Sequence, residues 1–261
     1  MIKLIVSDID GTLVNNEKEV PVSFWKAFER MQELDILFCV ASGRQIQSLH
    51  ELFAPIKNNI AYAPDNGASL IYQNKTLFEK LITPADYLPI MRTCNEINGI
   101  GVALCGRDKA YIKTDSEWIF DEIARHYPAH TTVSDFAAID DDIFKITICD
   151  EGISRLNSYQ YLKKYQNDFN VVISGEIWLD ITGKDVNKGN AITHLQRILE
   201  ITPEETVVFG DHMNDVEMIQ CAKHSYAMKN AQDELKALAK YVTEYDNNEA
   251  GVVKEIEKIL K

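Results

Sequence analysis

Short apolar runs alternate with helical periodicities along the first third of the chain. A short continuous apolar run is typical of a strand buried on both faces, whereas apolar residues three and four apart indicate a helix. Ser23 is the expected N-cap of the first helix. The expected elements are strands over Lys3–Ser7, Ile36–Ala41 and Ile60–Ala63 and helices over Phe24–Leu34 and Gln45–Phe53. Strand, helix, strand, helix, strand predicts a parallel α/β sheet.

The last third returns to the same alternation. The expected helices there are Lys188–Leu199, Asn214–Cys221, Ala231–Lys240 and Glu249–Leu260, and the expected strands are Thr206–Phe209, Ser225–Met228 and Tyr241–Thr243. Because strands and helices alternate here as they do in the first third, we expect residues 1–82 and 184–261 to form one discontinuous α/β domain.

Residues 83–183 have a different character. Gly106-Arg107-Asp108 separates two short strand patterns, which indicates a hairpin. The expected helices are Pro84–Asn98, Ser116–His126 and Ile153–Tyr165, and the expected strands are Gly101–Cys105, Lys109–Lys113, Ile143–Cys149 and an extended pair over Phe169–Thr182. Helices mixed with hairpins predict an α+β domain inserted into the α/β domain.

Composition and charge narrow the class of protein. The 261 residues carry a formal net charge of −13, which opposes nonspecific binding to nucleic acid or to anionic membranes but not to a small anionic substrate. The five cysteines include no Cys-x-x-Cys pair, which argues against a disulfide framework and a cysteine-rich zinc site. No run approaches the roughly 20 apolar residues of a membrane span. We therefore expect a cytoplasmic protein that binds neither nucleic acid nor membrane.

The most informative residues follow the first strand. Asp8 and Asp10 are two residues apart, so they point the same way if the strand continues, and Gly11 lets the chain turn after them. Ligands of open parallel sheets bind at such strand ends. Two neighbouring carboxylates need a cation, or a raised pKa on one of them. The alternative is an Asx-type turn without chemistry.

Other polar residues fall at comparable places in the α/β portion. Ser42 and Arg44 follow the second strand, and Lys188 begins a helix. Asp211, Asn214 and Asp215 follow the strand over Thr206–Phe209. Along one edge of a parallel sheet these groups would supply carboxylates, a hydroxyl, an amide and a lysine. That set suits phosphoryl transfer to a carboxylate, since a hard cation prefers oxygen ligands and phosphoryl oxygens need donors and positive charge.

The chain resembles the haloacid dehalogenase superfamily of phosphatases, and within it the Cof-type branch with a type IIB α/β cap. Four motifs carry the resemblance, in the family's order: Asp8-Ile9-Asp10-Gly11-Thr12, Ala41-Ser42-Gly43-Arg44, Asn187-Lys188-Gly189, and Gly210-Asp211-His212-Met213-Asn214-Asp215. The resemblance implies a Rossmann-like parallel-sheet core with an inserted α+β cap over residues 83–183 that selects the substrate.

The resemblance also implies roles for individual residues. Asp8 would be the nucleophile and Asp10 the general acid and base. Mg²⁺ would be held by Asp8, the main-chain carbonyl of Asp10 and Asp211, with Asp215 in support. The phosphoryl group would be bound by Ser42, Lys188 and Asn214 and by the backbone N–H groups of Ile9, Asp10 and Gly43. Arg44 is either a substrate contact or a solvated charge.

The implied activity is Mg²⁺-dependent hydrolysis of small phosphorylated metabolites, with sugar phosphates favoured, through an aspartyl-phosphate. A phosphomutase or phosphotransferase would use the same intermediate, and a phospho-accepting regulatory domain is the non-enzymatic alternative. Single residues have simpler interpretations too: Lys188 as a solvated helix start, Ser42 as a helix cap, and Asp215 as a first-turn acid. His212 stands where the family has a small residue. Its side chain would either reach the substrate or a carboxylate next to the metal ligands, or simply be exposed, and we expect the exposed position.

Overall fold

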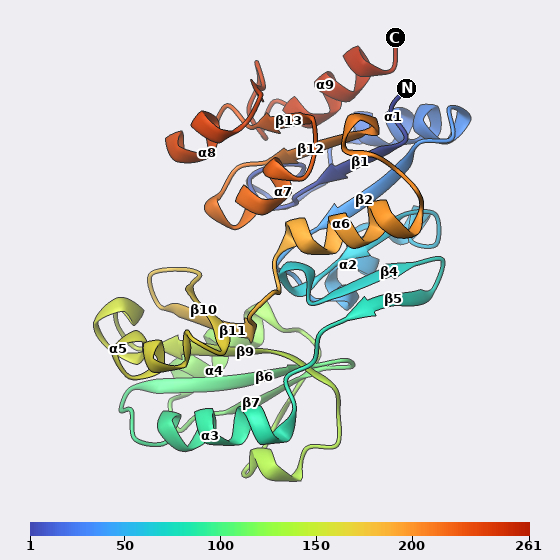
Figure 1. Cartoon of the computed structure of the whole chain (residues 1–261). Helices are drawn as coiled ribbons and strands as arrows, with labels where there is room; N and C mark the ends of the chain where they lie inside the picture. Colours follow the sequence, from blue (N-terminus) through green and yellow to red (C-terminus); the bar gives the residue numbers. More distant parts are fainter. The chain divides into compact units, whose positions relative to one another are not determined.

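The computed structural model describes residues 1–261. The chain divides into two compact units, one formed by Met1–Glu79 with Asn187–Lys261 and the other by Lys80–Val186. The expected insertion, 83–183, lies inside the second unit. The chain therefore leaves the first unit once, builds the second, and returns to complete the first (Figure 1).

The first unit is built on an eight-stranded sheet. From β14 to β3 every neighbouring pair is parallel, and β4 and β5 add an antiparallel edge. The strand order is β14 (Tyr241–Val242), β13 (His224–Ala227), β12 (Thr206–Gly210), β1 (Leu4–Ser7), β2 (Leu37–Ala41), β3 (Ala61–Ala63), β4 (Ser69–Tyr72) and β5 (Lys75–Glu79). The expected α/β fold with a parallel core sheet is confirmed.

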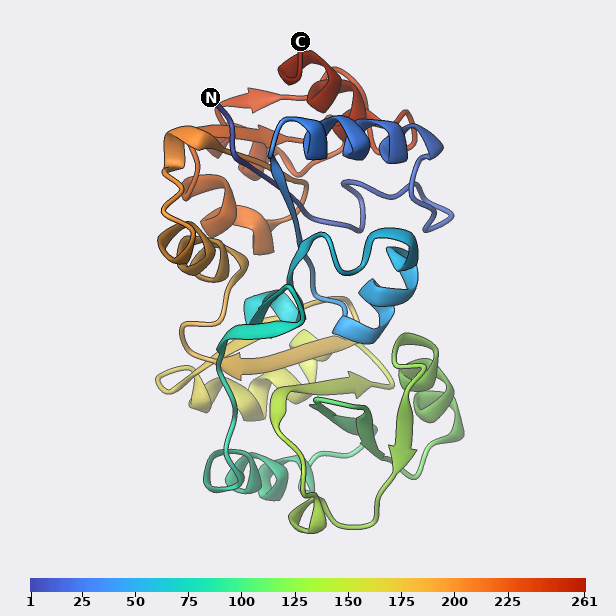
Figure 2. The same ribbon diagram turned by 90° about the vertical axis from the view of Figure 1, so that its right-hand side faces the viewer.

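Helices cover both faces of this sheet. In Figure 2, α6 and α7 lie on one side of the strands and α1 and α2 on the other. The helices of this unit are α1 (Val22–Glu33), α2 (Ile46–Leu52), α6 (Lys188–Ile198), α7 (Val216–Gln220), α8 (Asp233–Leu238) and α9 (Gly251–Ile259). All four residues of β1 are buried, which explains why its sequence is a continuous apolar run.

The second unit is an α+β domain with a six-stranded sheet. Its pairs are antiparallel except for β7 with β8. The strand order is β10 (Phe169–Ile173), β11 (Trp178–Gly183), β9 (Ile143–Asp150), β6 (Ile100–Gly106), β7 (Ala110–Lys113) and β8 (His130–Thr132), and the helices are α3 (Pro84–Cys94), α4 (Glu117–His126) and α5 (Ser158–Leu162). None of the helices in either unit is long and apolar enough to cross a membrane.

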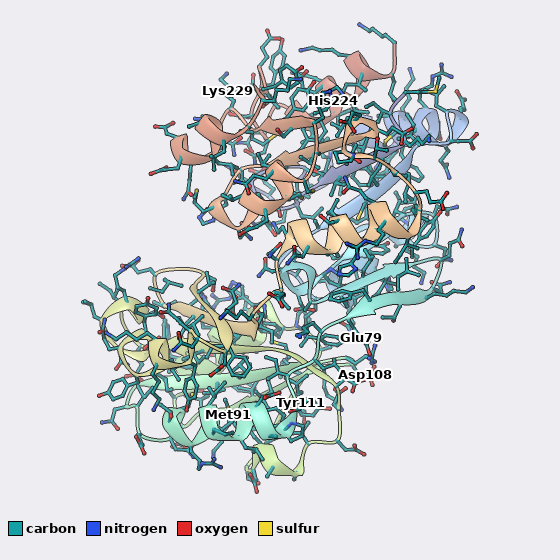
Figure 3. All side chains as sticks on the ribbon, viewed as in Figure 1. Glu79, Met91, Asp108, Tyr111, His224 and Lys229 are labelled. Carbon is teal, nitrogen blue, oxygen red and sulfur yellow. The ribbon has the colours of Figure 1, made fainter.

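Side chains fill the space around each sheet (Figure 3). Along β9, Ile146 and Ile148 join the apolar cluster that includes α3 and α5, whereas Cys149 joins the cluster that includes α4. Successive strand residues point to opposite faces, so this unit has an apolar cluster on each side of its sheet. All five cysteines are free thiols, and four of them are buried.

Several local expectations were wrong. The first helix begins at Val22 after Pro21, so Ser23 lies inside it and is not the N-cap. The expected helix over 153–165 is broken into the short α5 and two 3₁₀ turns. At the break, the buried carboxylate of Asp150 accepts the backbone N–H of Ser158 at 3.2 Å, which in a continuous helix would donate to the carbonyl of Ser154.

The β4–β5 hairpin and β8 were not foreseen from the sequence. Gln73 and Asn74 form the hairpin turn with φ of 52° and 59°. Two consecutive residues with positive φ are the hallmark of a two-residue hairpin turn. This turn lacks glycine, and so it gives a weak signal in the sequence.

Candidate active site

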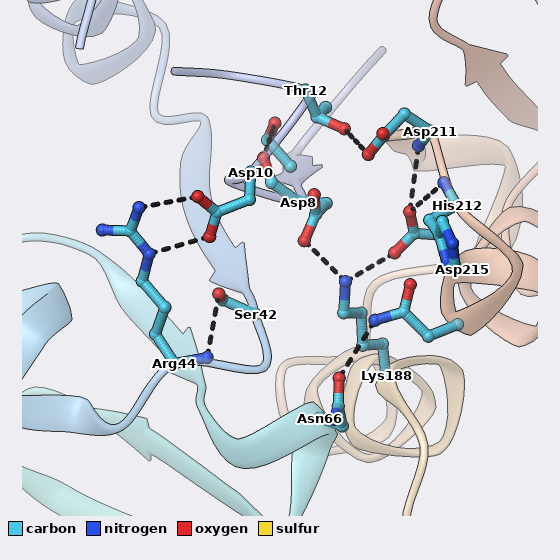
Figure 4. A network of polar contacts seen from close by, with 12 residues as sticks. Asp8, Asp10, Thr12, Ser42, Arg44, Asn66, Lys188, Asp211, His212 and Asp215 are labelled. Carbon is cyan, nitrogen blue, oxygen red and sulfur yellow. Dashed lines mark hydrogen bonds and ion pairs between the residues drawn. The ribbon is translucent and has the colours of Figure 1, made fainter. Parts of the chain in front are cut away.

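The predicted polar residues follow three adjacent parallel strands, β12, β1 and β2. Asp8 follows β1, Ser42 follows β2 and Asp211 follows β12. Lys188 is the first residue of α6. Because the strands are parallel neighbours, their carboxyl ends lie at one edge of the sheet, and the side chains converge there (Figure 4).

Lys188 links two of the acids. Its side chain is 1% exposed, and its ammonium donates to Oδ1 of Asp8 and to Oδ1 of Asp215, both at 2.6 Å. Burial alone would lower the pKa of Lys188, but the carboxylates of Asp215 and Asp8 outweigh burial and raise it. Lys188 is therefore a fixed cation inside the site and not a solvated helix start.

Asp8, Asp211 and Asp215 form a compact cluster of carboxylates. One oxygen of each lies within 4.8 Å of the others. Asp215 is fully buried, and its Oδ2 accepts the backbone N–H groups of Asp211 at 2.9 Å and His212 at 3.2 Å. The hydroxyl of Thr12 donates to Oδ1 of Asp211 at 2.8 Å.

The cluster holds more negative charge than Lys188 can balance. Burial is the largest cause that raises the pKa of Asp8 to about 8, and the carboxylates of Asp215 and Asp211 add to it against the opposing effect of Lys188. Burial also raises the pKa of Asp211. Three carboxylates with too little positive charge beside them fit a hard divalent cation such as Mg²⁺, which prefers oxygen ligands.

The loop after β1 requires glycine. Gly11 has a φ of +79°, and a Cβ on it would lie 2.3 Å from Oδ2 of Asp211. The backbone N–H groups of Thr12, Leu13 and Val14 all donate hydrogen bonds to the carbonyl of Ile9. The side chain of Ile9 is fully buried. Only a residue without a side chain brings this turn so close to the Asp211 carboxylate.

Asp10 has a different environment from Asp8. Its carboxylate accepts Nε and Nη2 of Arg44 at 2.8 and 2.7 Å and Nζ of Lys18 at 2.8 Å. Burial would raise the pKa of Asp10, but the hydrogen bonds from Arg44 and Lys18 outweigh it and lower the pKa to about 2. Asp10 is thus ionised at neutral pH, and its side chain is not part of the carboxylate cluster.

Arg44 is paired with Asp10 inside the protein, whereas the sequence suggested that it contacts the substrate or is a solvated charge. The role of Lys18 could not be predicted, because this residue lies in the polar stretch between β1 and α1 and belongs to no motif. Ser42 is buried, and its Oγ accepts the N–H of Arg44 at 3.1 Å. It does not cap α2, whose N-cap is Gln45. His212 is exposed, as expected.

Asn214 and Asn66 meet on this edge. Nδ2 of Asn214 donates to Oδ1 of Asn66 at 3.1 Å. Asn66 follows β3, and a Cβ on Gly43 would lie 3.3 Å from its Oδ1. In the sequence, Asn66-Gly67 resembles another feature of the haloacid dehalogenase superfamily near the site, and the simpler interpretation is an ordinary Asn-Gly turn.

Comparison with known proteins identifies the family. The profile of the haloacid dehalogenase-like hydrolases matches residues 5–256. The chain belongs to this family. The resemblance drawn from the four motifs is therefore confirmed.

Two relatives that are named as phosphatases are similar over nearly their whole length. The 5-amino-6-(5-phospho-D-ribitylamino)uracil phosphatase YbjI of Escherichia coli is 31% identical, covering 100% of this chain and 97% of the relative. YcsE of Bacillus subtilis is also named as a 5-amino-6-(5-phospho-D-ribitylamino)uracil phosphatase. It is 26% identical, covering 98% of this chain and 94% of the relative. This haloacid dehalogenase-like hydrolase is an enzyme of the phosphoric monoester hydrolase class.

A solved structure agrees in fold with this family member. The subclass IIB sugar phosphatase BT4131 superimposes with a TM-score of 0.83 at 25% identity, covering 98% of each chain. The similarity extends over both units, including the inserted α+β unit.

Proposed function

We propose that the protein is a Mg²⁺-dependent phosphatase that hydrolyses small phosphorylated metabolites through an aspartyl-phosphate on Asp8. The observation that carries the proposal is the setting of Asp8. Its carboxylate is buried at a strand end, bonded to the buried ammonium of Lys188 and grouped with Asp211 and Asp215. A structural role does not require three acids and a buried lysine in one cluster.

Asp8, Asp211 and Asp215, together with the main-chain carbonyl of Asp10, are the proposed holders of Mg²⁺. A bound Mg²⁺ supplies charge neutralisation for the carboxylates and for the phosphoryl oxygens. The remaining chemistry belongs to the chain's own residues.

Asp8 attacks phosphorus in the proposed first step. A carboxylate oxygen forms the O–P bond while the bond from phosphorus to the leaving oxygen breaks, and the leaving oxygen takes a proton from Asp10. Water then attacks phosphorus and gives a proton to Asp10. The bond between phosphorus and the Asp8 oxygen breaks, so inorganic phosphate leaves and the Asp8 carboxylate is restored. Since Arg44 and Lys18 hold Asp10 ionised, Asp10 must loosen these ion pairs and gain a proton before it acts as the acid.

The transferring phosphoryl group is bound in this proposal by Ser42, Lys188 and Asn214. Backbone N–H groups of Ile9, Asp10 and Gly43 add donors at the same strand ends. Positioning and charge neutralisation supply most of the rate in phosphoryl transfer.

The proposed substrate class is phosphate esters of sugars and related polyols. The substrate in the names of YbjI and YcsE carries a phosphorylated ribityl chain, and BT4131 is a sugar phosphatase by name. We assign selection of the leaving group to the inserted unit, Lys80–Val186. The free, unpatterned cysteines support a cytoplasmic location.

A panel experiment tests the function. Inorganic phosphate release is measured with Mg²⁺ and with EDTA, for 5-amino-6-(5-phospho-D-ribitylamino)uracil, hexose and pentose phosphates, nucleoside monophosphates and p-nitrophenyl phosphate. We expect Mg²⁺-dependent release, fastest for a sugar or ribityl phosphate. Formation of an isomerised sugar phosphate without release would favour the mutase alternative. Absence of both reactions across the panel would contradict the proposal.

A trapping experiment tests the nucleophile separately. Crystals grown with Mg²⁺ and beryllium fluoride, a phosphoryl mimic, are expected to show the mimic on a carboxylate oxygen of Asp8. Density for the mimic on any other residue would contradict the assignment of Asp8.

A further inference from the structure

The segment between β3 and β4 is strained at the candidate site. Asp65, Asn66 and Gly67 have φ of 49°, 57° and 86°, three consecutive residues in the left-handed region. Asparagine and aspartate tolerate this region better than other side chains, but it still costs free energy, and strained backbone often marks a functional site. A Cβ on Gly67 would lie 2.5 Å from the carbonyl oxygen of Asn187, the residue before Lys188.

This strained segment is joined to the strand-end loops on either side of it. The N–H of Asp65 donates to the carbonyl of Arg44 at 3.0 Å, and the N–H of Asn66 donates to the carbonyl of Ser42 at 2.8 Å. The side chain of Asn66 accepts Nδ2 of Asn214 at 3.1 Å. Asn66 thus joins the loop after β2 to the loop after β12, which bracket Asp8 (Figure 4).

The hydrogen bond to Asn66 fixes the direction of the Asn214 amide. A primary amide has two N–H groups in a fixed plane, and its oxygen and nitrogen are otherwise interchangeable by rotation. With one N–H bonded to Asn66, the nitrogen of Asn214 faces Asn66 and its second N–H remains for a phosphoryl oxygen. Asn214 is exposed, so no packing would hold the amide in this orientation without Asn66.

We propose that Asn66 is a positioning residue, which orients the amide of Asn214 for phosphoryl binding. The inference rests on the proposed function and goes beyond it, because Asn66 acts through Asn214 and not on the substrate. The hydrogen bond from the backbone N–H of Asn66 to Ser42 and the left-handed conformation of Asn66 keep its side-chain oxygen Oδ1 in place. The conformation is why an asparagine suits the position: it supplies both a tolerated positive φ and an amide acceptor.

The test uses Asn66→Gly, because glycine keeps the left-handed conformation and removes only the side chain. Asn74→Gly is the matched control, since Asn74 has a φ of 59° in the β4–β5 turn of the same unit. Asn214→Ala and the double variant complete a double-mutant cycle. The readouts are KM, kcat and the inhibition constant of inorganic phosphate.

We expect Asn66→Gly to raise the inhibition constant of phosphate and KM roughly 3- to 10-fold, the range for one lost hydrogen bond. Asn214→Ala should act similarly, the double variant should equal Asn214→Ala alone, and Asn74→Gly should equal wild type. Unchanged phosphate inhibition in Asn66→Gly, or independent effects in the double variant, would overturn the inference while leaving the phosphatase in place. A wild-type protein without turnover or phosphate binding would overturn both.

Discussion

Asp8 and Asp10 are two residues apart, yet their carboxyl groups have opposite electrostatic environments. Burial among other acids raises the pKa of Asp8 to about 8, whereas Arg44 and Lys18 overcome burial and lower that of Asp10 to about 2. Neighbouring carboxyls with pKa values pushed apart are typical of residues that share one reaction in different roles.

Asp8→Asn should abolish phosphate release, by roughly 10³-fold or more, because the amide cannot attack phosphorus. The melting temperature of this variant in the absence of metal should not fall, since the amide removes the cost of ionising a buried carboxyl beside other acids. Asp168→Asn, on the exposed surface of the second unit, is the isosteric control and should keep full activity. Turnover near the wild-type rate in Asp8→Asn would rule out Asp8 as nucleophile.

Asp10→Asn should reduce the rate most for substrates with poor leaving groups. An alkoxide needs the proton that Asp10 supplies, whereas p-nitrophenolate leaves without it, and general acid catalysis contributes about 10²- to 10⁴-fold. Single-turnover rates for a sugar phosphate and for p-nitrophenyl phosphate check this difference. Equal losses for both substrates in the chemical step would exclude Asp10 as the acid.

At the scale of elements, the contact between α6 and α7 positions the site. A Cβ on Gly189 would lie 2.3 Å from the carbonyl carbon of Glu217, so glycine permits the two helices to approach closely. Lys188 begins α6, and Asp215 directly precedes α7. The close approach therefore fixes the ion pair between Lys188 and Asp215.

Gly189→Ala should destabilise the fold by about 1–3 kcal/mol, because the added methyl group must displace backbone atoms. It should also lower kcat, since Lys188 and Asp215 would shift apart. Gly152→Ala is the control, because a methyl group added there would have no atom within 4 Å. Urea denaturation measures both variants, and an unchanged midpoint for Gly189→Ala would show that the helices can separate without cost.

At the scale of the whole molecule, the charge of the site links stability to pH and to metal. The pKa of Asp8 is about 8 in the folded protein against 3.8 for an unperturbed aspartate carboxyl, so the folded state binds the proton more tightly. This group's contribution to stability is fully present below about pH 4 and is lost as the pH rises toward about 8. A cation bound by the cluster would oppose this loss.

We therefore expect the metal-free protein to lose stability relative to Asp8→Asn as the pH rises from about 4 to about 8. Added Mg²⁺ should raise the melting temperature of the wild type more at the upper end of this window than at the lower end. Thermal melts in EDTA and in Mg²⁺ across the window check both statements. Mg²⁺ stabilisation that is independent of pH would contradict the placement of the ion at Asp8.

Elements with a strong local pattern could be predicted, and those governed by distant contacts could not. The strand β1 and the helix α1 follow from apolar spacing alone. At the break in 153–165 the backbone N–H of Ser158 donates to Asp150, the last residue of β9. The β4–β5 hairpin depends on a turn of Gln73 and Asn74, whose sequence resembles an ordinary loop.

The family, the parallel α/β core and the order of the four motifs could be derived from the residues along the chain, because each motif follows its own strand or opens its own helix. The electrostatics of the site could not be derived in this way. The clamp of Arg44 and Lys18 on Asp10, the pairing of Lys188 with Asp215, and the bond from Asn214 to Asn66 join separate segments of the chain. Burial and distance control these interactions, and both are set when the strands assemble.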